Sequence, residues 1–217
     1  MRYRPLGRTG LSVSELSYGA ARGATNAPDD FAASIETVID AGINLIDTAE
    51  HYHGSEEALG AALVGHDDVL VQTKHLPYAD FSPEAAYTGT PEGVVATAEQ
   101  SLRRLRRDRL DIFLGHGMRT AASYEQFMSD GCCEAMINLK AQGKVRFIGI
   151  SELSEADGTH EILKQAVPSG IFDVVMLTVN FLLQTAIDDI LPLCRTHGVG
   201  TVVMMPLNQA SAVSGLV

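Results

Sequence analysis

Cysteine, positive charge and long apolar runs are all scarce in this chain of 217 residues, and each scarcity excludes a class of protein. Three cysteines, Cys132, Cys133 and Cys194, are too few and too irregularly spaced for a disulfide framework or a zinc site. The 16 Lys and Arg residues against 27 Asp and Glu give a formal net charge of −11, which argues against a nucleic-acid partner. No apolar run reaches the length of a membrane span, and the N-terminus lacks the apolar core of a signal peptide. We therefore expect a cytoplasmic protein without a membrane partner.

The strongest regularity in the sequence is an alternation of short apolar runs with helical patterns. The runs predict seven strands, at residues 16–20, 44–48, 69–74, 110–114, 145–151, 174–180 and 200–206. Repeated strand–helix units imply parallel strands with right-handed crossovers, in a (β/α) barrel or in an open doubly wound sheet. The first strand is not followed by the glycine pattern of a dinucleotide-binding turn, so we favour the barrel. No linker interrupts the pattern, which predicts a single barrel domain over residues 1–217.

Local signals predict where some elements begin. The segment Gly7-Arg8-Thr9-Gly10 has the composition of a hairpin turn, which predicts an N-terminal β-hairpin before the barrel. Thr90 followed by Pro91 reads as the N-cap and first residue of a helix. Ser55 is predicted to cap another helix, whose first turn carries two glutamates.

Titratable residues stand at the ends of three consecutive predicted strands. Asp47 ends the second strand, Lys74 ends the third, His116 follows the fourth, and Tyr52 lies five residues beyond Asp47. In a barrel the carboxyl ends of the strands converge on one face, where active sites lie. A nearby ammonium stabilises a phenolate and lowers the pKa of the tyrosine, while a carboxylate would hold the ammonium charged. The four residues therefore predict a site in which Tyr52 protonates a developing oxyanion, assisted by His116.

Other interpretations of these residues stay open. Any one of them alone is more often structural, since strand-end aspartates pair with lysines and single histidines often pack in cores. The long segment 75–89 carries several aromatic residues, which fit a substrate pocket and a simple cover of the barrel rim equally well.

Several motifs in order resemble the aldo-keto reductase family. The most specific runs from Asn44 to Gly60 and reads NLIDTAEHYHGSEEALG; others are YRPLGRTGL from Tyr3 and GKVRFIGIS from Gly143. The resemblance implies a TIM barrel and NAD(P)H-dependent reduction of an aldehyde or ketone, or oxidation of a sugar. It places the catalytic tetrad on Asp47, Tyr52, Lys74 and His116, with Tyr52 as general acid. The stretch from Ser169 to Met176 looks closest to the sugar-dehydrogenase-like branch.

The predicted cofactor-binding positions depart from the pattern of that family. Members usually hold the nicotinamide carboxamide with Ser-Asn on the fifth strand and Gln on the sixth, and stack an aromatic ring near the end of the seventh. Here the set is Ser151, Glu152, Met176 and Met204, followed by Pro206 and Leu207. The pattern predicts seven strands, and only ten residues follow Leu207, so we expect no eighth strand and helix, where the family's adenosine-phosphate site lies. We therefore expect NADP(H) if any cofactor, a barrel shortened at its C-terminus, and a homo-oligomer that covers the open strand edges.

Three alternatives to a reductase remain. The first keeps the tetrad but has lost the nucleotide, and would run a dehydration, isomerisation or cyclisation of a carbonyl compound. The second is a metal-dependent hydrolase, suggested by four histidines near predicted strand ends: His51, His53, His75 and His116. We assign no metal ligands, because His51 and His53 flank Tyr52 in a predicted loop and the first strand carries no ligand. The third is a non-enzymatic subunit, against which the complete tetrad argues.

Overall fold

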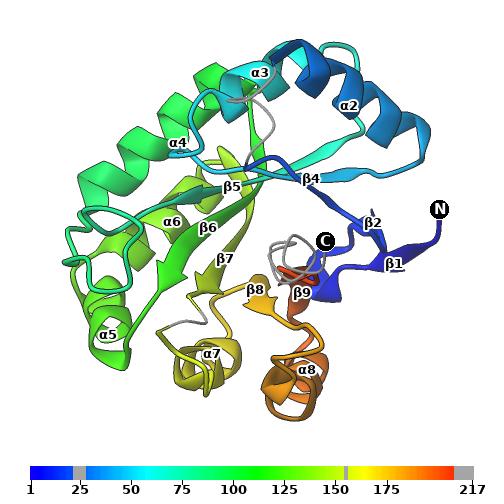
Figure 1. Ribbon diagram of the computed structural model, residues 1–217. Coiled ribbons are helices and arrows are strands. Elements are labelled where there is room, and N and C mark those ends of the chain that lie inside the picture. The colour runs from blue at the N-terminus through cyan, green and yellow to red at the C-terminus, as the bar shows by residue number, and fades with distance from the viewer. Residues whose placement is uncertain (22–27, 154–155, 208–217) are drawn as a thin grey trace.

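A curved parallel sheet covered by helices on its outer face forms the body of the protein (Figure 1). The structure is a computed structural model and describes residues 1–21, 28–153 and 156–207. The strands of the main sheet, in their spatial order, are β3 (Tyr18–Gly19), β4 (Leu45–Asp47), β5 (Leu70–His75), β6 (Leu110–Met118), β7 (Val145–Glu152), β8 (Val174–Thr178) and β9 (Gly200–Met204). All neighbours pair in parallel, which confirms the prediction of an incomplete (β/α) barrel.

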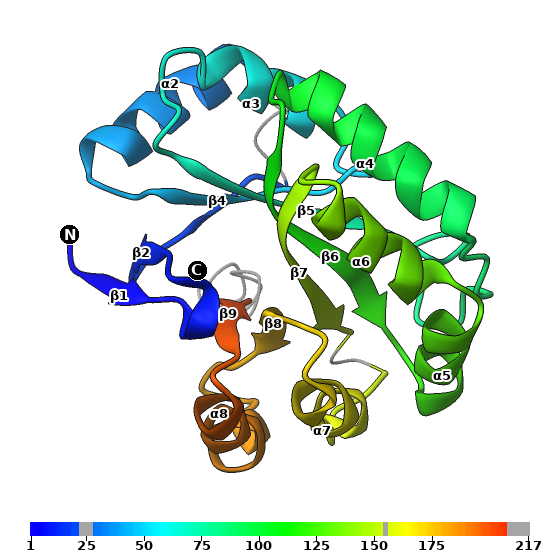
Figure 2. The same ribbon diagram turned by 180° about the vertical axis from the view of Figure 1, so that it is seen from behind.

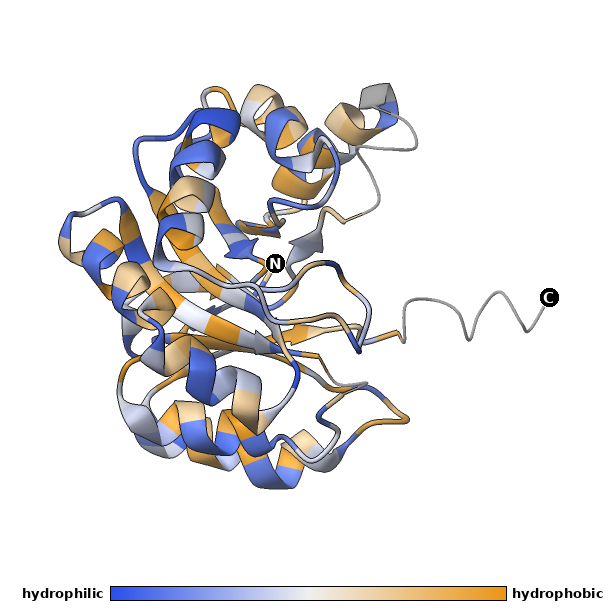
Figure 3. Ribbon diagram, turned by 90° about the vertical axis from the view of Figure 1, so that its left-hand side faces the viewer, coloured by the Kyte–Doolittle hydropathy of each residue, from blue (hydrophilic) through white to orange (hydrophobic). Residues whose placement is uncertain are grey.

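The connecting helices follow the strands in chain order. They are α2 (Pro28–Asp40), α3 (Ser55–Ala62), α4 (Pro91–Leu105), α5 (Ala121–Ser129), α6 (Cys132–Ala141), α7 (Glu161–Ala166) and α8 (Thr185–His197), with a short 3-10 helix η2 (Val167–Ser169) after α7. Along each helix apolar and polar segments alternate, whereas the central strands are mostly apolar (Figure 3). This is the pattern expected when one helix face packs on a sheet and the other faces water. No helix of the described residues is long and apolar enough to cross a membrane.

An N-terminal hairpin closes one end of the sheet. It consists of β1 (Tyr3–Pro5), a 3-10 turn η1 (Gly7–Thr9) and β2 (Ser12–Ser14), as the turn signal predicts. It lies beside β9 (Figure 2), where the Arg8 guanidinium donates hydrogen bonds to the carbonyl oxygens of Gly170 and Phe172 at 2.9 Å. Gly7 has φ +52°, and a Cβ there would lie 2.3 Å from the backbone nitrogen of Gly200. The hairpin thus covers the amino ends of β8 and β9.

Of the local predictions, one is confirmed and two need correction. Thr90 caps α4 as predicted, accepting the N–H of Gly93 at 3.0 Å. Ser55 is not a cap: the N-cap of α3 is Gly54, and Ser55 is the first helical residue. Its hydroxyl instead lies 2.8 Å from that of Thr48, because the side chain is buried against the end of β4. The fourth predicted strand extends to Met118, so His116 lies within β6 rather than after it.

Candidate active site

A buried ion pair between Asp47 and Lys74 forms the centre of the site. Asp47 is the last residue of β4, and Lys74 is the last but one of the adjacent strand β5. The Lys74 Nζ lies 2.8 Å from each carboxylate oxygen of Asp47 and donates to the carbonyl oxygen of Thr48 at 2.7 Å. Gln72 adds a hydrogen bond from its Nε2 to Asp47 Oδ1 at 2.6 Å. The ammonium is therefore fixed in position although it is fully buried.

The environment of Lys74 keeps it charged. Burial by itself would lower the pKa of Lys74, because an ammonium loses its hydration in the protein interior. The charge of Asp47 acts in the opposite direction, as do Tyr52 and the hydrogen bonds, and the pKa of Lys74 ends above its usual value. A positive charge therefore stands at the base of the site at neutral pH.

Tyr52 lies next to this ammonium, in the loop between β4 and α3. The Lys74 Nζ is 4.9 Å from the centre of the Tyr52 ring. Burial and the charge of Asp47 raise the pKa of Tyr52, the charge of Lys74 and a hydrogen bond with it lower the pKa, and the net result lies above the ordinary value. The ammonium does lower the pKa of Tyr52, as predicted, but burial together with the charge of Asp47 outweighs this effect. The phenol is consequently protonated at neutral pH.

His116 faces the same space from β6. Its ring centre lies 6.0 Å from that of Tyr52, nearly perpendicular to it. The strand is irregular between Gly115 and Met118, and Gly117 has φ +64°, a conformation that favours glycine. Burial, followed by the charge of Lys74, holds the pKa of His116 well below its usual value. The imidazole is therefore neutral, and its buried Nδ1 has no hydrogen-bond partner among the described residues.

These side chains open into one cavity of about 820 Å³. The four predicted tetrad residues all line it: Asp47, Tyr52, Lys74 and His116. Further polar lining comes from Ser14, Glu15, Ser17, Glu152 and Thr201. Much of the remaining lining is apolar, and includes Leu16, Phe81, Leu153, Met176 and Met204. A largely apolar cleft with a few convergent polar groups is the usual form of a small-molecule site. This arrangement can present a phenolic proton to an oxygen atom of a bound small molecule.

The residues predicted to bind a cofactor divide into two groups. Glu152, Met176, Met204 and Pro206 line the cavity. Ser151 and Leu207 are not part of that lining: Leu207 is exposed, and Ser151 is buried with its Oγ accepting the Gly117 N–H at 2.7 Å. Met176 and Met204 thus lie in the cavity wall, whereas the predicted Ser151 is hydrogen-bonded to the backbone of Gly117.

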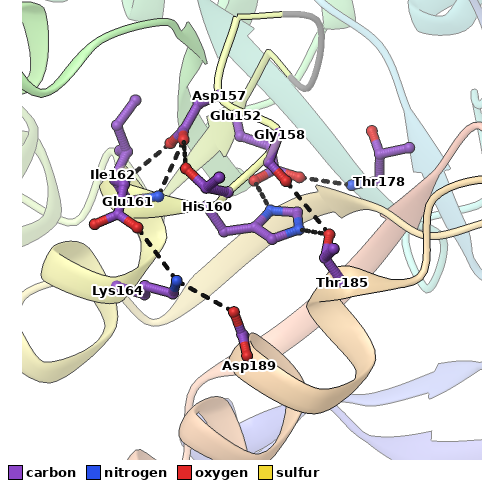
Figure 4. A network of polar contacts seen from close by, with 11 residues as sticks. Glu152, Asp157, Gly158, His160, Glu161, Ile162, Lys164, Thr178, Thr185 and Asp189 are labelled. Atoms are coloured by element: carbon purple, nitrogen blue, oxygen red, sulfur yellow. Dashed lines mark hydrogen bonds and ion pairs between the residues drawn. The ribbon is translucent and has the colours of Figure 1, made fainter.

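Glu152 belongs to a buried hydrogen-bond network that ties β7 to its neighbours (Figure 4). Its Oε1 accepts the Thr178 N–H at 2.9 Å, and its Oε2 lies 2.7 Å from His160 Nδ1. The other ring nitrogen of His160 lies 2.8 Å from the Thr185 hydroxyl at the start of α8. Burial raises the pKa of Glu152, against the effect of His160 and Thr178. Both carboxylate oxygens are therefore already engaged by the protein.

The histidines of the metal alternative do not converge. His53 is exposed, and His75 Nδ1 lies 2.8 Å from the Thr97 hydroxyl behind the site. His51 stacks on Phe81 with 5.3 Å between ring centres, and lies 4.7 Å from the His116 ring. Within residues 1–21, 28–153 and 156–207, no group of three or more His, Cys, Asp or Glu side chains is arranged to hold a metal ion.

Sequence reasoning missed several residues that shape the site. Gln72 could have been found, because residues two apart on a strand share a face and Gln72 stands two before Lys74. The carbonyl of Thr48 holds the ammonium, but a backbone acceptor leaves no mark in the sequence. Arg119 meets the loop between β5 and α4 only in the folded structure, where its guanidinium donates to the carbonyl oxygen of Asp80. For the aromatic segment 75–89 the sequence leaves open a substrate pocket and a cover of the rim, and its Phe81 lines the cavity.

Fold and site together define a (β/α)-barrel protein with a buried acid/base cluster at the carboxyl ends of its strands. The sequence pattern of the Aldo/keto reductase family matches residues 15–215. The chain belongs to the aldo/keto reductase family, as its motifs predict.

The relatives of the chain include proteins of named activity. It is 33% identical over 215 residues to L-galactose dehydrogenase of Arabidopsis thaliana, a match that covers 94% of this chain and 65% of that protein. It is 30% identical over 230 residues to NADH-specific methylglyoxal reductase of Escherichia coli (strain K12), covering 96% and 68%. The chain therefore spans about two thirds of the length of these relatives.

Solved structures agree with the fold. A putative aldo-keto reductase from Pseudomonas aeruginosa matches with a TM-score of 0.79 at 27% identity, over 93% of this chain and 77% of that one. The holo form of an aldo-keto reductase from Bacillus halodurans matches with a TM-score of 0.78 at 27% identity, over 94% and 65%.

Proposed function

We propose that this protein reduces the carbonyl group of a small aldehyde or ketone with NAD(P)H, or runs the reverse oxidation of a sugar or other alcohol. The observation that carries the proposal is the contact of Tyr52 with a buried ammonium, both of which line a cavity of about 820 Å³. Family membership supports it, as do relatives named for L-galactose dehydrogenation and NADH-specific methylglyoxal reduction. L-galactose and methylglyoxal are therefore the first substrates to test.

The chemistry follows from the protonation states. A reduced nicotinamide, when bound, supplies the hydride. Tyr52 is protonated at neutral pH and donates its phenolic proton to the carbonyl oxygen as negative charge develops there. The Lys74 ammonium, held by Asp47 and Thr48, stabilises the phenolate left behind. His116, kept neutral by burial, hydrogen-bonds the substrate oxygen without competing for the proton. The products are an alcohol and an oxidised cofactor.

The cavity fits the reacting end of such a cofactor. Met176, Met204 and Pro206 form an apolar wall against which a planar ring can pack, and thioethers make favourable contacts with rings. The predicted carboxamide contacts fit less well, because Ser151 accepts the Gly117 N–H and Glu152 is bound to His160 and Thr178. The adenosine end has no assigned residues in the described part of the chain.

The test is a titration of NADH and of NADPH, followed by nicotinamide fluorescence, with turnover of methylglyoxal and of L-galactose measured in parallel. The proposal expects saturable binding of at least one nucleotide and turnover that depends on it. Absence of binding at millimolar nucleotide would refute it.

The engaged Ser151 and Glu152 favour a second candidate, an acid/base enzyme that uses the same tetrad without a nucleotide. Dehydration or isomerisation of a carbonyl compound needs the proton of Tyr52 but no hydride. Turnover that persists after complete removal of nucleotide, and is lost in Tyr52→Phe, would favour this candidate over the reductase.

A further inference from the structure

Phe81 is a large apolar side chain left exposed beside the acid/base cluster. It lies in the loop at residues 76–90 between β5 and α4, is 45% exposed, and lines the cavity together with Tyr52 and His116. Burying a phenylalanine stabilises a protein by about 1.5–3 kcal/mol relative to leaving it in water. An exposed ring at the mouth of a site is therefore available to contact a ligand.

The ring is oriented by two imidazoles. His51 stacks on it at 5.3 Å between ring centres with an interplanar angle of 23°, and His116 lies at 5.0 Å with an angle of 59°. Burial, and after it the charge of Lys74, lower the pKa of His51 to about 4, and His116 is also neutral. This wall is consequently uncharged at neutral pH. One face of Phe81 packs on His51, and its exposed surface contributes to the cavity lining.

Arg119 fixes the backbone that carries Phe81. Its guanidinium lies 3.7 Å from the centre of the Tyr78 ring, and donates to the carbonyl oxygens of Asp80 at 2.8 Å and Ala85 at 3.1 Å. Asp80 directly precedes Phe81. Arg119 is 2% exposed, so these bonds are shielded from water. A planar guanidinium can make this stacked, two-point contact, whereas a lysine ammonium cannot reproduce it.

We propose that Phe81 and His51 form a subsite for an uncharged planar ring attached to the substrate carbonyl carbon, and that Arg119 is the positioning residue of that subsite. A ring stacked or set edge-on against Phe81 would bring its carbonyl group toward Tyr52. Aromatic pairs gain affinity from ring geometry beyond the area that they bury. The inference rests on the proposed function only for the reaction at the carbonyl, and not for the binding of the ring.

The test compares two unreactive probes, benzamide and cyclohexanecarboxamide, by ligand-observed NMR titration without nucleotide. The probes share the amide and differ in the planarity of the ring. Wild-type protein is expected to bind benzamide more tightly. Phe81→Leu is expected to weaken the binding of benzamide about 3- to 10-fold, and to change the binding of cyclohexanecarboxamide less than about 2-fold. Phe181→Leu is the matched control, because Phe181 is 63% exposed but does not line the cavity.

Arg119 is tested by a double-mutant cycle. Arg119→Lys is expected to reduce the benzamide preference in the wild-type background and to leave it unchanged in the Phe81→Leu background. A general loss of stability would weaken both probes equally and would not reproduce this pattern.

Three results would overturn the proposal: no benzamide binding at millimolar concentration, equal binding of the two probes, or a Phe81→Leu variant that weakens both alike. If the benzamide preference depends on Phe81 but no carbonyl is reduced, the proposed function fails and the subsite stands. If carbonyls are reduced with no preference that depends on Phe81, the subsite fails alone.

Discussion

Replacing Asp47 by Asn should destabilise the protein in a pH-dependent way. The substitution keeps the shape of the side chain but removes the negative charge 2.8 Å from Lys74 Nζ. Lys74 is 0% exposed, so its ammonium would keep only neutral partners such as the Thr48 carbonyl. Breaking a buried pair by removing one partner costs about 3–5 kcal/mol. With an m-value of about 2–3 kcal/mol/M in urea, a loss of about 3 kcal/mol moves the midpoint by roughly 1–1.5 M.

The sign of the pH dependence follows from the pKa of Lys74. In wild-type protein this pKa is raised above the unfolded value, so the contribution of Lys74 is fully present below the unfolded pKa and is lost only as pH rises through the folded one. In Asp47→Asn the charge that opposes burial is gone, and the folded pKa should fall below the unfolded value. The unfolded variant then binds more protons than the folded variant, so its stability rises with pH. The difference in free energy of unfolding between wild type and Asp47→Asn should therefore become smaller between about pH 7 and pH 9.5.

Urea denaturation followed by far-UV circular dichroism at both pH values measures this gap. Lys74→Met combined with Asp47→Asn is the control, because two neutral side chains leave no unpaired buried ion and should recover part of the lost stability. A gap below about 1 kcal/mol, or one that does not change with pH, would refute the assignment of Lys74 as a buried ammonium held by Asp47.

Three further predictions concern the rest of the molecule. Burial raises the pKa of Glu152 in the folded protein. The free energy of unfolding of wild type relative to Glu152→Gln should therefore be greatest below the pKa of Glu152 in the unfolded chain, and should fall as pH rises through its pKa in the folded protein. Urea denaturation at about pH 4 and pH 7 checks this. Gly10→Ala should lower the free energy of unfolding by about 1–2 kcal/mol, because of its positive φ alone. Gly7→Ala should lower it by about 1–3 kcal/mol more, because the added Cβ would collide with the Gly200 nitrogen. Thermal unfolding of the two variants compares them. The strand order leaves β3 and β9 at the edges of the main sheet in the described residues, so we expect self-association, which light scattering after size exclusion would detect. A monodisperse monomer at high concentration would contradict that expectation.

The strand pattern of the fold could be predicted because parallel strands covered on both faces leave a strong apolar signal. Six of the seven predicted runs overlap structural strands closely, while the first shrinks to Tyr18–Gly19 at the edge of the sheet. The fourth predicted run stops at residue 114, whereas β6 continues irregularly through the glycines at 115 and 117 to Met118. The prediction that Ser55 is the N-cap of α3 was wrong, because Gly54, in a left-handed conformation, occupies that position.

The acid/base cluster could be located from the sequence because the barrel brings strand ends together. Its electrostatics could not, since the net pKa shift of Tyr52 depends on how deeply the phenol is buried. The contacts of Glu152 could not be predicted either. His160 is close to it in sequence, but Thr178 on β8 reaches Glu152, and Thr185 on α8 reaches His160, only in the folded chain.

The account depends most on the proton of Tyr52. The direct test measures carbonyl turnover by wild type, Tyr52→Phe and Tyr124→Phe, the last a matched tyrosine on α5 outside the cavity lining. Loss of a general acid lowers the rate about 10²- to 10⁴-fold. We expect that loss in Tyr52→Phe with unchanged nucleotide affinity, and near wild-type turnover in Tyr124→Phe. Turnover within about 3-fold of wild type in Tyr52→Phe would contradict the account.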